Sequence, residues 1–566
     1  MKFSEFKYER PDYEELRPRF MYCVEKISKS ETYKEQKKYI ENINEIRNVL
    51  KSMNEIIQIR YSMNTDEVYY REEKSYWDEE GPLYDELNSY FYKSIVESKF
   101  KNEIIEDYGS QFYKICEFSL KAFSKDIIAE LQEENRLCSE YTRLLASAKI
   151  EFRGEVRNLS GIYSYMLSGD RKTREEASEK YYGFFEEKSN DFDCVFDRLV
   201  KLRDEIGKKL GYENFIEVGY LRMMRTEYDR KMVEIFRNQV EKDIIPLAEV
   251  LYERQARRLG VESLDFIDEN IEFKSGNPTP KGDASYILES GVKMYTELSD
   301  ETGEFIKFIL ENELIDWKER DGKAAGGYCT YIPAYKSPFI FSNFNSTLED
   351  IDVLTHEAGH AFQLYMSRWI SSPEINFPTL DSCEIHSMSM EFITWPWMEL
   401  FFGDEADKYR FSHLSTAIKF IPYGVLVDEF QHIIYENPGL SPKERNEVWR
   451  NLERKYQPHR EYPNCEFLES GGWWYKQGHI FKNPFYYIDY ALAQVCSLQI
   501  WEKSRVDESG YWEDFKNMCK VGGSKSFTEI VSIGRLKSPF AKGSLFDVAK
   551  SAKKYFDSID DIEIDK

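Results

Sequence analysis

Three residues near the middle of the chain have the types and spacing of a catalytic metal site. His356, Glu357 and His360 form the pattern H-E-x-x-H, in a chain with only seven histidines. Side chains four residues apart project from the same face of an α-helix, so the two imidazoles can bind one cation. Glu357 projects in another direction, which suits a carboxylate that removes a proton from zinc-activated water. The pattern therefore predicts a hydrolytic zinc centre with Glu357 as the general base.

Two histidines leave a catalytic zinc ion short of the usual three protein ligands. Glu384 follows far enough along the chain for the first helix to end, a loop to reverse direction and a second helix to begin. Asp381 and Ser382 resemble an N-cap region, which would place Glu384 in the first turn of that second helix. We therefore expect His356, His360 and Glu384 to hold one Zn²⁺ ion, with a water or substrate oxygen in the fourth position.

A second glutamate on the same predicted helix could support the metal ligands. Glu391 falls two helical turns after Glu384, where it could accept a hydrogen bond from a ligand histidine and fix its tautomer. The alternative is a solvated or ion-paired glutamate on the helix flank, and the sequence leaves both open. His386 projects elsewhere on the helix, and we expect a structural role for it.

Helical periodicity dominates the chain outside one short region. Apolar residues recur at spacings of three and four through the N-terminal part, which predicts a helical lobe over residues 1–165 and a catalytic domain over residues 166–566. Between Asp321 and Asn345, two β-favouring runs punctuated by Gly and Pro predict two strands. Helix returns from Leu348 with an acidic first turn. The fold class expected is mainly α.

Charge and cysteine content limit the partners and the compartment. The formal net charge of -25 opposes binding to nucleic acid or to an anionic membrane surface. The charged N-terminus has no apolar signal region, and no stretch approaches the ~20 apolar residues that a membrane-spanning helix needs. The nine cysteines contain no C-x-x-C pair, and their odd number leaves at least one unpaired. We expect a cytoplasmic protein without nucleic-acid or membrane partners.

The metal motif and its surroundings resemble one family of peptidases. Beyond the H-E-x-x-H pattern, the resemblance rests on residues 384–392, on residues 326–330 and on residues 338–344. In these segments the chain is similar to the thimet-oligopeptidase-like metallopeptidases of family M3, on the oligoendopeptidase F and Pz-peptidase branch. That resemblance implies two helical lobes flanking a deep substrate channel, with a small β-sheet beside the zinc site.

The same resemblance implies residues that bind a peptide. The segment that begins at Gly326 is similar to the family's strand beside the cleft, where an extended peptide adds backbone hydrogen bonds. An ordinary turn is the alternative there. Residues 479–490 are similar to the family's His- and Tyr-rich substrate loop, although packing is the alternative for any one of forty tyrosines. The implied catalytic donors are Tyr490 and His479, and the implied substrate-binding residues are Gly326, Gly327, Tyr328, Tyr486 and Tyr487.

The leading functional hypothesis is a zinc-dependent endopeptidase that hydrolyses internal bonds of short oligopeptides. A site deep between helical lobes would exclude folded proteins and admit short peptide substrates. One alternative is a zinc metallocarboxypeptidase of another helical H-E-x-x-H family, which would use the same ligand types. The other is a non-catalytic peptide-binding protein, against which the presence of every expected ligand and of the base argues.

Overall fold

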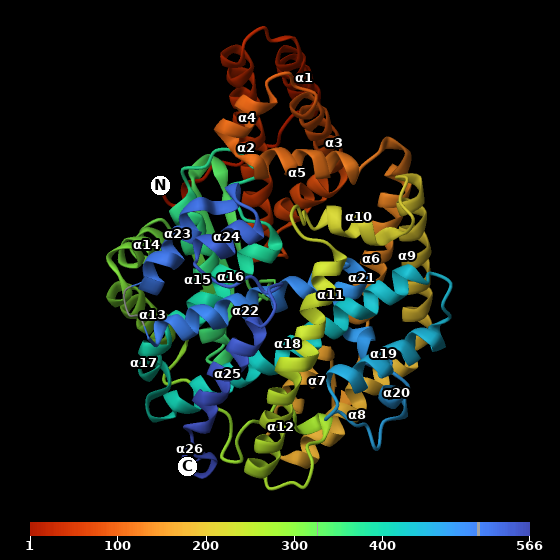
Figure 1. Ribbon diagram of the computed structural model, residues 1–566, viewed down its shortest axis with the longest axis vertical. Coiled ribbons are helices and arrows are strands. Elements are labelled where there is room, and N and C mark those ends of the chain that lie inside the picture. The colour runs from red at the N-terminus through yellow and green to blue at the C-terminus, as the bar shows by residue number, and fades with distance from the viewer. Residues whose placement is uncertain (325, 507–509, 566) are drawn as a thin grey trace. The chain divides into compact units, whose positions relative to one another are not determined.

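The fold is described by a computed structural model over residues 1–324, 326–506 and 510–565. Helices account for most of these residues, as Figure 1 shows, which confirms the predicted mainly α class. Backbone contacts divide the chain into two compact units, each assembled from three segments. The first unit comprises Met1–Leu120, Thr279–Ala406 and Cys496–Ser538, and the second comprises Lys121–Pro278, Asp407–Val495 and Pro539–Lys566. The contiguous division at residue 165 and the substrate channel remain predictions.

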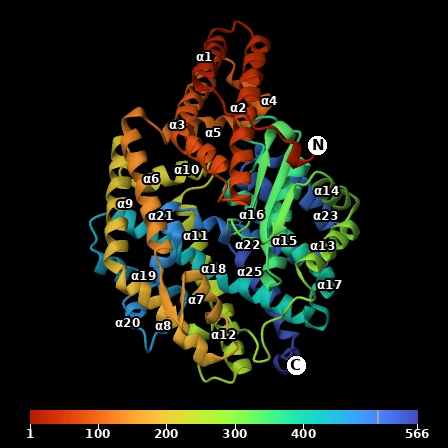
Figure 2. The same cartoon turned by 180° about the vertical axis from the view of Figure 1, so that it is seen from behind.

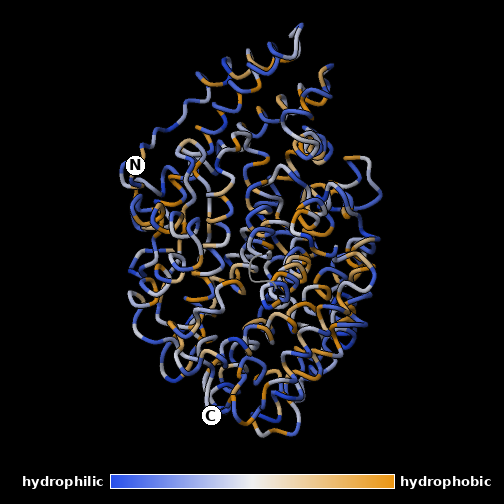
Figure 3. The backbone as a smooth tube through the Cα atoms, turned by 60° about the vertical axis from the view of Figure 1, so that its left-hand side comes forward, coloured by the Kyte–Doolittle hydropathy of each residue, from blue (hydrophilic) through white to orange (hydrophobic). Residues whose placement is uncertain are grey.

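The first unit combines an N-terminal group of helices with a small sheet and the helices that follow it. Apolar and polar residues alternate along the helices, seen as orange and blue segments in Figure 3, as expected for helices with one buried face. The helices are α1 (Tyr13–Lys29), α2 (Tyr33–Met63), α3 (Val68–Val96), α4 (Lys101–Tyr108), α5 (Ser110–Lys121), α13 (Ala284–Leu298), α14 (Asp300–Glu311), α15 (Leu348–Ser367), α16 (Leu380–Ile393), α17 (Met398–Phe402), α23 (Gly510–Val521) and α24 (Phe527–Ile533).

The second unit is also built mainly from helices. Helix α22 (Tyr487–Ser504) begins in it and ends in residues assigned to the first unit. The other helices are α6 (Ile128–Ala146), α7 (Leu159–Met166), α8 (Arg171–Glu187), α9 (Ser189–Lys209), α10 (Phe215–Arg222), α11 (Arg230–Gln239), α12 (Ile245–Leu259), α18 (Ala406–Glu436), α19 (Pro442–Tyr456), α20 (Glu466–Glu469), α21 (Gly478–Lys482), α25 (Ser544–Asp557) and α26 (Asp561–Ile564).

A three-stranded sheet in the first unit has the order β3-β5-β4. The central strand β5 (Ser337–Phe344) is buried along almost its whole length, and it pairs antiparallel with β4 (Tyr328–Ile332). These two strands are the ones predicted from the sequence. The parallel strand β3 (Ile315–Lys318) was not predicted, because it is too short to show a periodic pattern. Helices α2 and α15 both pack against β4, and the strands are visible as green arrows in Figure 2.

A short hairpin interrupts the N-terminal part that the sequence predicted to be helical. Strands β1 (Ile150–Phe152) and β2 (Glu155–Arg157) pair antiparallel in the second unit. The two residues between them, Arg153 and Gly154, have φ angles of 51° and 85°. Positive φ at both central positions gives the turn whose twist matches that of paired strands. The helical prediction was therefore wrong for these residues.

Helix α15 starts where the sequence predicted, whereas α16 starts earlier. The Asp350 carboxylate accepts backbone N–H bonds from Asn345 and Ser346, at 3.0 and 2.7 Å, and so holds the chain just before α15. The predicted N-cap at Asp381 and Ser382 is wrong: the carbonyl of Thr379 accepts the first bonds of α16, and the helix begins at Leu380. Glu384 is thus beyond the first turn.

The described residues contain no helix that is both long and apolar enough to cross a bilayer. All nine cysteines are present as free thiols, five of them buried. The described chain is therefore held together by packing and polar contacts rather than by disulfides.

Candidate metal centre

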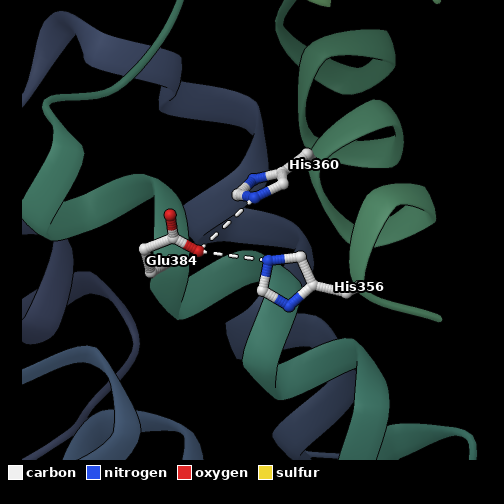
Figure 4. Close-up of side chains that lie close together, drawn as sticks. All are labelled: His356, His360 and Glu384. Carbon is white, nitrogen blue, oxygen red and sulfur yellow. Dashed lines mark ion pairs between the residues drawn. The ribbon is translucent and has the colours of Figure 1, made fainter. Parts of the chain in front are cut away.

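The predicted ligands come together in the first unit. His356 and His360 project from α15 toward Glu384 on α16, as Figure 4 shows. The Nε2 atoms of His356 and His360 lie 3.3 and 3.5 Å from the same oxygen, Oε2 of Glu384. A candidate ligand atom from each residue lies within 4.8 Å of the other two. This convergence of two imidazoles and one carboxylate is the arrangement expected for a metal site.

Two of the three separations between these candidate ligands can be compared with the geometry of zinc. Ligand atoms about 2.0–2.1 Å from a tetrahedral zinc lie roughly 3.3–3.4 Å from one another. Both nitrogen–oxygen separations agree with that value. Two nitrogens and one oxygen also form a donor set typical of catalytic zinc, which keeps its fourth position open. His356 retains 26% side-chain exposure, so the cluster is reachable from solvent.

Gly359 explains how the two helices approach closely enough to share an ion. A Cβ atom at this position would lie 2.7 Å from the Ser387 Cα and 2.8 Å from the His386 carbonyl oxygen, both on α16. Any larger residue would therefore push α15 and α16 apart. The sequence showed Gly359 only as a variable position of the motif, because its contact is made with a distant segment.

Glu391 bonds to one of the predicted ligands. Its Oε1 atom lies 2.6 Å from Nδ1 of His356, so the Nδ1–H donates and Nε2 faces Glu384. Burial disfavours the charged form of His356, but hydrogen bonds with Glu384 and Glu391 outweigh it and raise its pKa well above the usual value. The sequence left open whether Glu391 bonds to a ligand histidine or lies solvated or ion-paired on the helix flank. In the structure it bonds to His356, one of the predicted ligands.

Ser387 and Cys383 contact the carboxylate ligand and were missed by the sequence reasoning. The Ser387 hydroxyl donates to Oε2 of Glu384 at 3.0 Å, and the Cys383 thiol lies 3.8 Å from Oε1. Burial alone would favour the neutral acid, yet the charge of His360 and the bond with His356 hold the pKa of Glu384 well below its usual value. The three-residue spacing from Glu384 to Ser387 on one helix was the available signal.

His386 has the structural role that its spacing predicted. Its side chain is completely buried, and its Nδ1–H donates to the carbonyl of Ser382 at 3.0 Å. Burial lowers the pKa of His386 to about 4, with a further contribution from the charge of His360. A neutral, buried imidazole on this side of α16 packs the helix, and His386 is not part of the cluster formed by His356, His360 and Glu384.

Glu357 lies beside the start of strand β4. A Cβ atom built on Gly327 would come within 4.0 Å of the Glu357 Oε1 atom and 3.1 Å from Val353, so the glycine leaves room next to the carboxylate. Burial raises the pKa of Glu357, and the charge of His356 opposes the rise. A carboxylate with a raised pKa is a better proton acceptor. Gly327 thus lets the start of β4 lie close to the helix that carries the base candidate.

The other predicted residues of this region lie just before β4 and at its first position. Gly326 has a φ of 94°, and a Cβ there would meet nothing within 4 Å. Tyr328 is the first residue of the strand, and its ring stacks on Phe341 of β5 with centroids 5.0 Å apart. In the described part of the chain, strand β4 pairs with β5 on one side only. Its other side is an edge, which is the feature that a peptide needs for strand addition.

The predicted His- and Tyr-rich residues form a cluster of their own in the second unit. The ring centroid of His479 lies 5.7 Å from that of Tyr486, 5.0 Å from that of Tyr487 and 5.8 Å from that of Tyr490. All four side chains are half-buried. We call these four residues the His-Tyr cluster. The tertiary structure brings them together from the short helix α21 and the start of α22.

Comparisons with known proteins agree over almost the whole chain. The model of the peptidase M3 N-terminal domain matches residues 3–123, and that of peptidase family M3 matches residues 164–547. An oligoendopeptidase F homolog of Borreliella burgdorferi is 24% identical over 467 residues, which cover 77% of this chain and 76% of the relative. The oligopeptidase PepF of Bacillus subtilis is 22% identical over 443 residues, covering 73% of this chain and 64% of the relative.

A solved structure extends this similarity to the fold. The structure of Pz peptidase A with an inhibitor is 50% identical to this chain and superimposes with a TM-score of 0.94. The match covers 99% of this chain and all of the other. With a family model that spans more than half of its residues, and a ligand cluster at the spacing of the metal motif, the chain belongs to peptidase family M3.

Proposed function

We propose that this peptidase is a zinc-dependent endopeptidase that hydrolyses internal peptide bonds of short oligopeptides. The observation that carries the proposal is the convergence of His356, His360 and Glu384 on one point, with separations that suit tetrahedral zinc. The names of the relatives, oligoendopeptidase F and oligopeptidase, agree with short peptides as substrates.

The three ligands would hold one zinc ion, and Glu391 would keep the proton of His356 on Nδ1 so that Nε2 can coordinate. Zinc supplies two kinds of chemistry at such a site, acidification of water and polarisation of a carbonyl group. Glu357 accepts the proton of the attacking water and returns it to the leaving amine. The raised pKa of Glu357 and its position beside the start of β4 support the assignment.

The peptide is proposed to bind as an added strand along β4. The free edge of that strand offers backbone N–H and C=O groups, and Gly326 and Gly327 permit close approach of the substrate. We further propose that Tyr490 and His479 donate hydrogen bonds to the tetrahedral oxyanion, and that Tyr486 and Tyr487 contact the substrate. An internal binding mode along a strand edge requires neither terminus of the peptide.

The decisive experiment uses peptides of graded length with an acetylated N-terminus and an amidated C-terminus. Mass spectrometry of the products, with and without a chelator, is expected to show internal cleavage that the chelator abolishes and zinc restores. Cleavage that demands a free C-terminal carboxylate would instead identify a carboxypeptidase. Peptide binding without cleavage, at full zinc content, would identify a non-catalytic binding protein.

Substitution of the base separates catalysis from metal binding. Glu357→Gln keeps the size of the side chain but cannot accept a proton, so kcat is expected to fall by about 10²–10⁴-fold. The zinc content should stay at one ion per chain, because Glu357 is not a ligand. A Glu357→Gln enzyme with normal kcat would exclude the proposed mechanism.

A further inference from the structure

The amide side chain of Gln477 lies between His479 and Tyr423 and bonds to both. The Nε2 atom of Gln477 donates to Nδ1 of His479 at 2.9 Å, and its Oε1 atom accepts from the hydroxyl of Tyr423 at 2.8 Å. Tyr423 projects from α18, whereas Gln477 lies between the 3₁₀ turn Gly472–Lys476 and helix α21. Both ends of the Gln477 amide are therefore used, one by a phenol and one by an imidazole.

The direction of these hydrogen bonds follows from the groups next to Tyr423. Burial, with a smaller effect of Tyr487, raises the pKa of Tyr423 well above its usual value, so the phenol keeps its proton. Among the described residues, the Gln477 amide oxygen is the one hydrogen-bond acceptor of the Tyr423 hydroxyl. The amide must then present its N–H₂ side to His479.

The reversed arrangement would leave a buried proton without an acceptor. If the amide were rotated, the Tyr423 hydroxyl would face the N–H₂ group of Gln477, and its own proton would have no acceptor among the described residues. Leaving a buried donor unsatisfied is unfavourable. An imidazole whose Nδ1 accepts a hydrogen bond carries its proton on Nε2 when it is neutral.

The backbone also fixes Gln477 in place. Its N–H donates to the carbonyl of Trp474 at 2.9 Å, and its carbonyl accepts the N–H of Ile480 at 3.1 Å. Around the imidazole stand the rings of Tyr486, Tyr487 and Tyr490, so the His479 ring is restrained on its faces and edges. The amide therefore acts on a ring that has little freedom to turn away.

We propose that Gln477 is a positioning residue, which holds His479 as the neutral Nε2–H tautomer and so makes it a hydrogen-bond donor toward the peptide. The tautomer of His479 is a property of this chain alone, whereas its role as a donor toward the peptide rests on the proposed function. The class of ligand group that this donor fits is a carbonyl or oxyanion oxygen, because an Nε2–H cannot accept a hydrogen bond.

The tautomer is measured directly by ¹⁵N NMR of the zinc-loaded enzyme labelled at the histidine rings. Seven histidines give a spectrum simple enough to assign, with His479 identified by its loss in His479→Asn. Protonated and unprotonated ring nitrogens differ widely in chemical shift. The wild-type protein is expected to show Nδ1 of His479 unprotonated and Nε2 protonated, and the opposite pattern would overturn the proposal without any variant.

Two substitutions then test whether Gln477 sets the tautomer of His479. Gln477→Glu replaces the N–H donor with an acceptor, so His479 is expected to carry a proton on Nδ1, and kcat should fall about 10- to 100-fold with little change in KM. Tyr423→Phe removes the bond that orients the amide and is expected to lower kcat about fivefold. The control is Gln239→Glu, at a glutamine of the same unit whose side-chain hydrogen bonds to described residues join it to the backbone of Pro539 and Gly543.

The outcomes separate this inference from the proposed function. An unchanged His479 spectrum in Gln477→Glu would exclude Gln477 as the residue that sets the tautomer. A switched tautomer with unchanged kcat and KM would exclude a role in hydrolysis. If the wild-type enzyme cleaved no peptide, the proposed function would fail, while the tautomer measurement would still decide whether Gln477 orients His479.

Discussion

The predicted metal ligands His356, His360 and Glu384, here called the metal cluster, lie in the first unit, and the His-Tyr cluster lies in the second. The two clusters hold their side chains by different means. In the metal cluster, two long helices touch at Gly359, and the ligands are bonded to one another and to Glu391. In the His-Tyr cluster, one imidazole is surrounded by three phenol rings and oriented by the amide of Gln477.

This difference has a physical origin in the task of each group. Metal ligands need fixed distances, which close backbone packing between helices provides. Donors to a substrate need a fixed direction and proton position, which a hydrogen bond from the protein provides. Substitutions in the two clusters should therefore have different effects. Those in the metal cluster should release the metal, and those in the His-Tyr cluster should lower turnover at full metal content.

The largest effect is expected from Glu384→Gln. The neutral amide cannot replace the carboxylate ligand, so zinc content should fall below one ion per chain and activity by more than about 10³-fold. Metal analysis after gel filtration, together with peptide hydrolysis, measures both quantities. Glu349→Gln, the same change at an exposed position in the first turn of α15, should leave zinc and activity near normal. Full zinc content in Glu384→Gln would remove this residue from the ligand set.

A smaller effect without metal loss is expected from Tyr490→Phe. Loss of an oxyanion donor should lower kcat about 10²- to 10³-fold while zinc content stays at one ion per chain. Steady-state kinetics on a blocked peptide provide the measurement. Tyr163→Phe, at an exposed tyrosine of the same unit, serves as the control. If Tyr490→Phe released zinc, the distinction between the two clusters would be wrong.

Glu391→Ala is expected to weaken metal binding about 10- to 100-fold, because His356 loses the acceptor that orients it. Competition with a zinc chelator of known affinity measures the change. Glu391→Gln should recover part of the affinity, since its amide oxygen can still accept the Nδ1–H. Equal affinities of the alanine variant and the wild type would make Glu391 an ordinary helix residue.

The smallest effect is expected from Gly359→Ala, which adds a methyl group where α15 and α16 touch. Overpacking at this contact should lower the free energy of unfolding by about 1–3 kcal/mol. Denaturant unfolding measures this change. At Gly303 in α14, a Cβ would meet atoms only at 3.6 Å or beyond, so Gly303→Ala should be neutral or stabilise by up to about 1 kcal/mol. Equal effects of the two substitutions would show that the helices are free to separate.

Much of the metal centre could be predicted because it depends on local spacing. Residues His356 and His360 face the same way on any α-helix, and the chemistry of zinc demanded a third ligand such as Glu384. The predicted N-cap of α16 was wrong because Asp381 and Ser382 bond to side chains near them, while Thr379 provides the first carbonyl. Short elements such as β3 carry too few residues to show a period.

By itself, the sequence determined the mainly α class and pointed to the three candidate ligands that converge in the structure, because helical periodicity and the spacing of the motif are properties of neighbouring residues. Only the tertiary structure decided that Gly359 is the contact between α15 and α16, and that Gln477 faces His479 on one side and Tyr423 on the other. These contacts depend on directions that side chains take in space after distant segments have packed, and no local pattern encodes them.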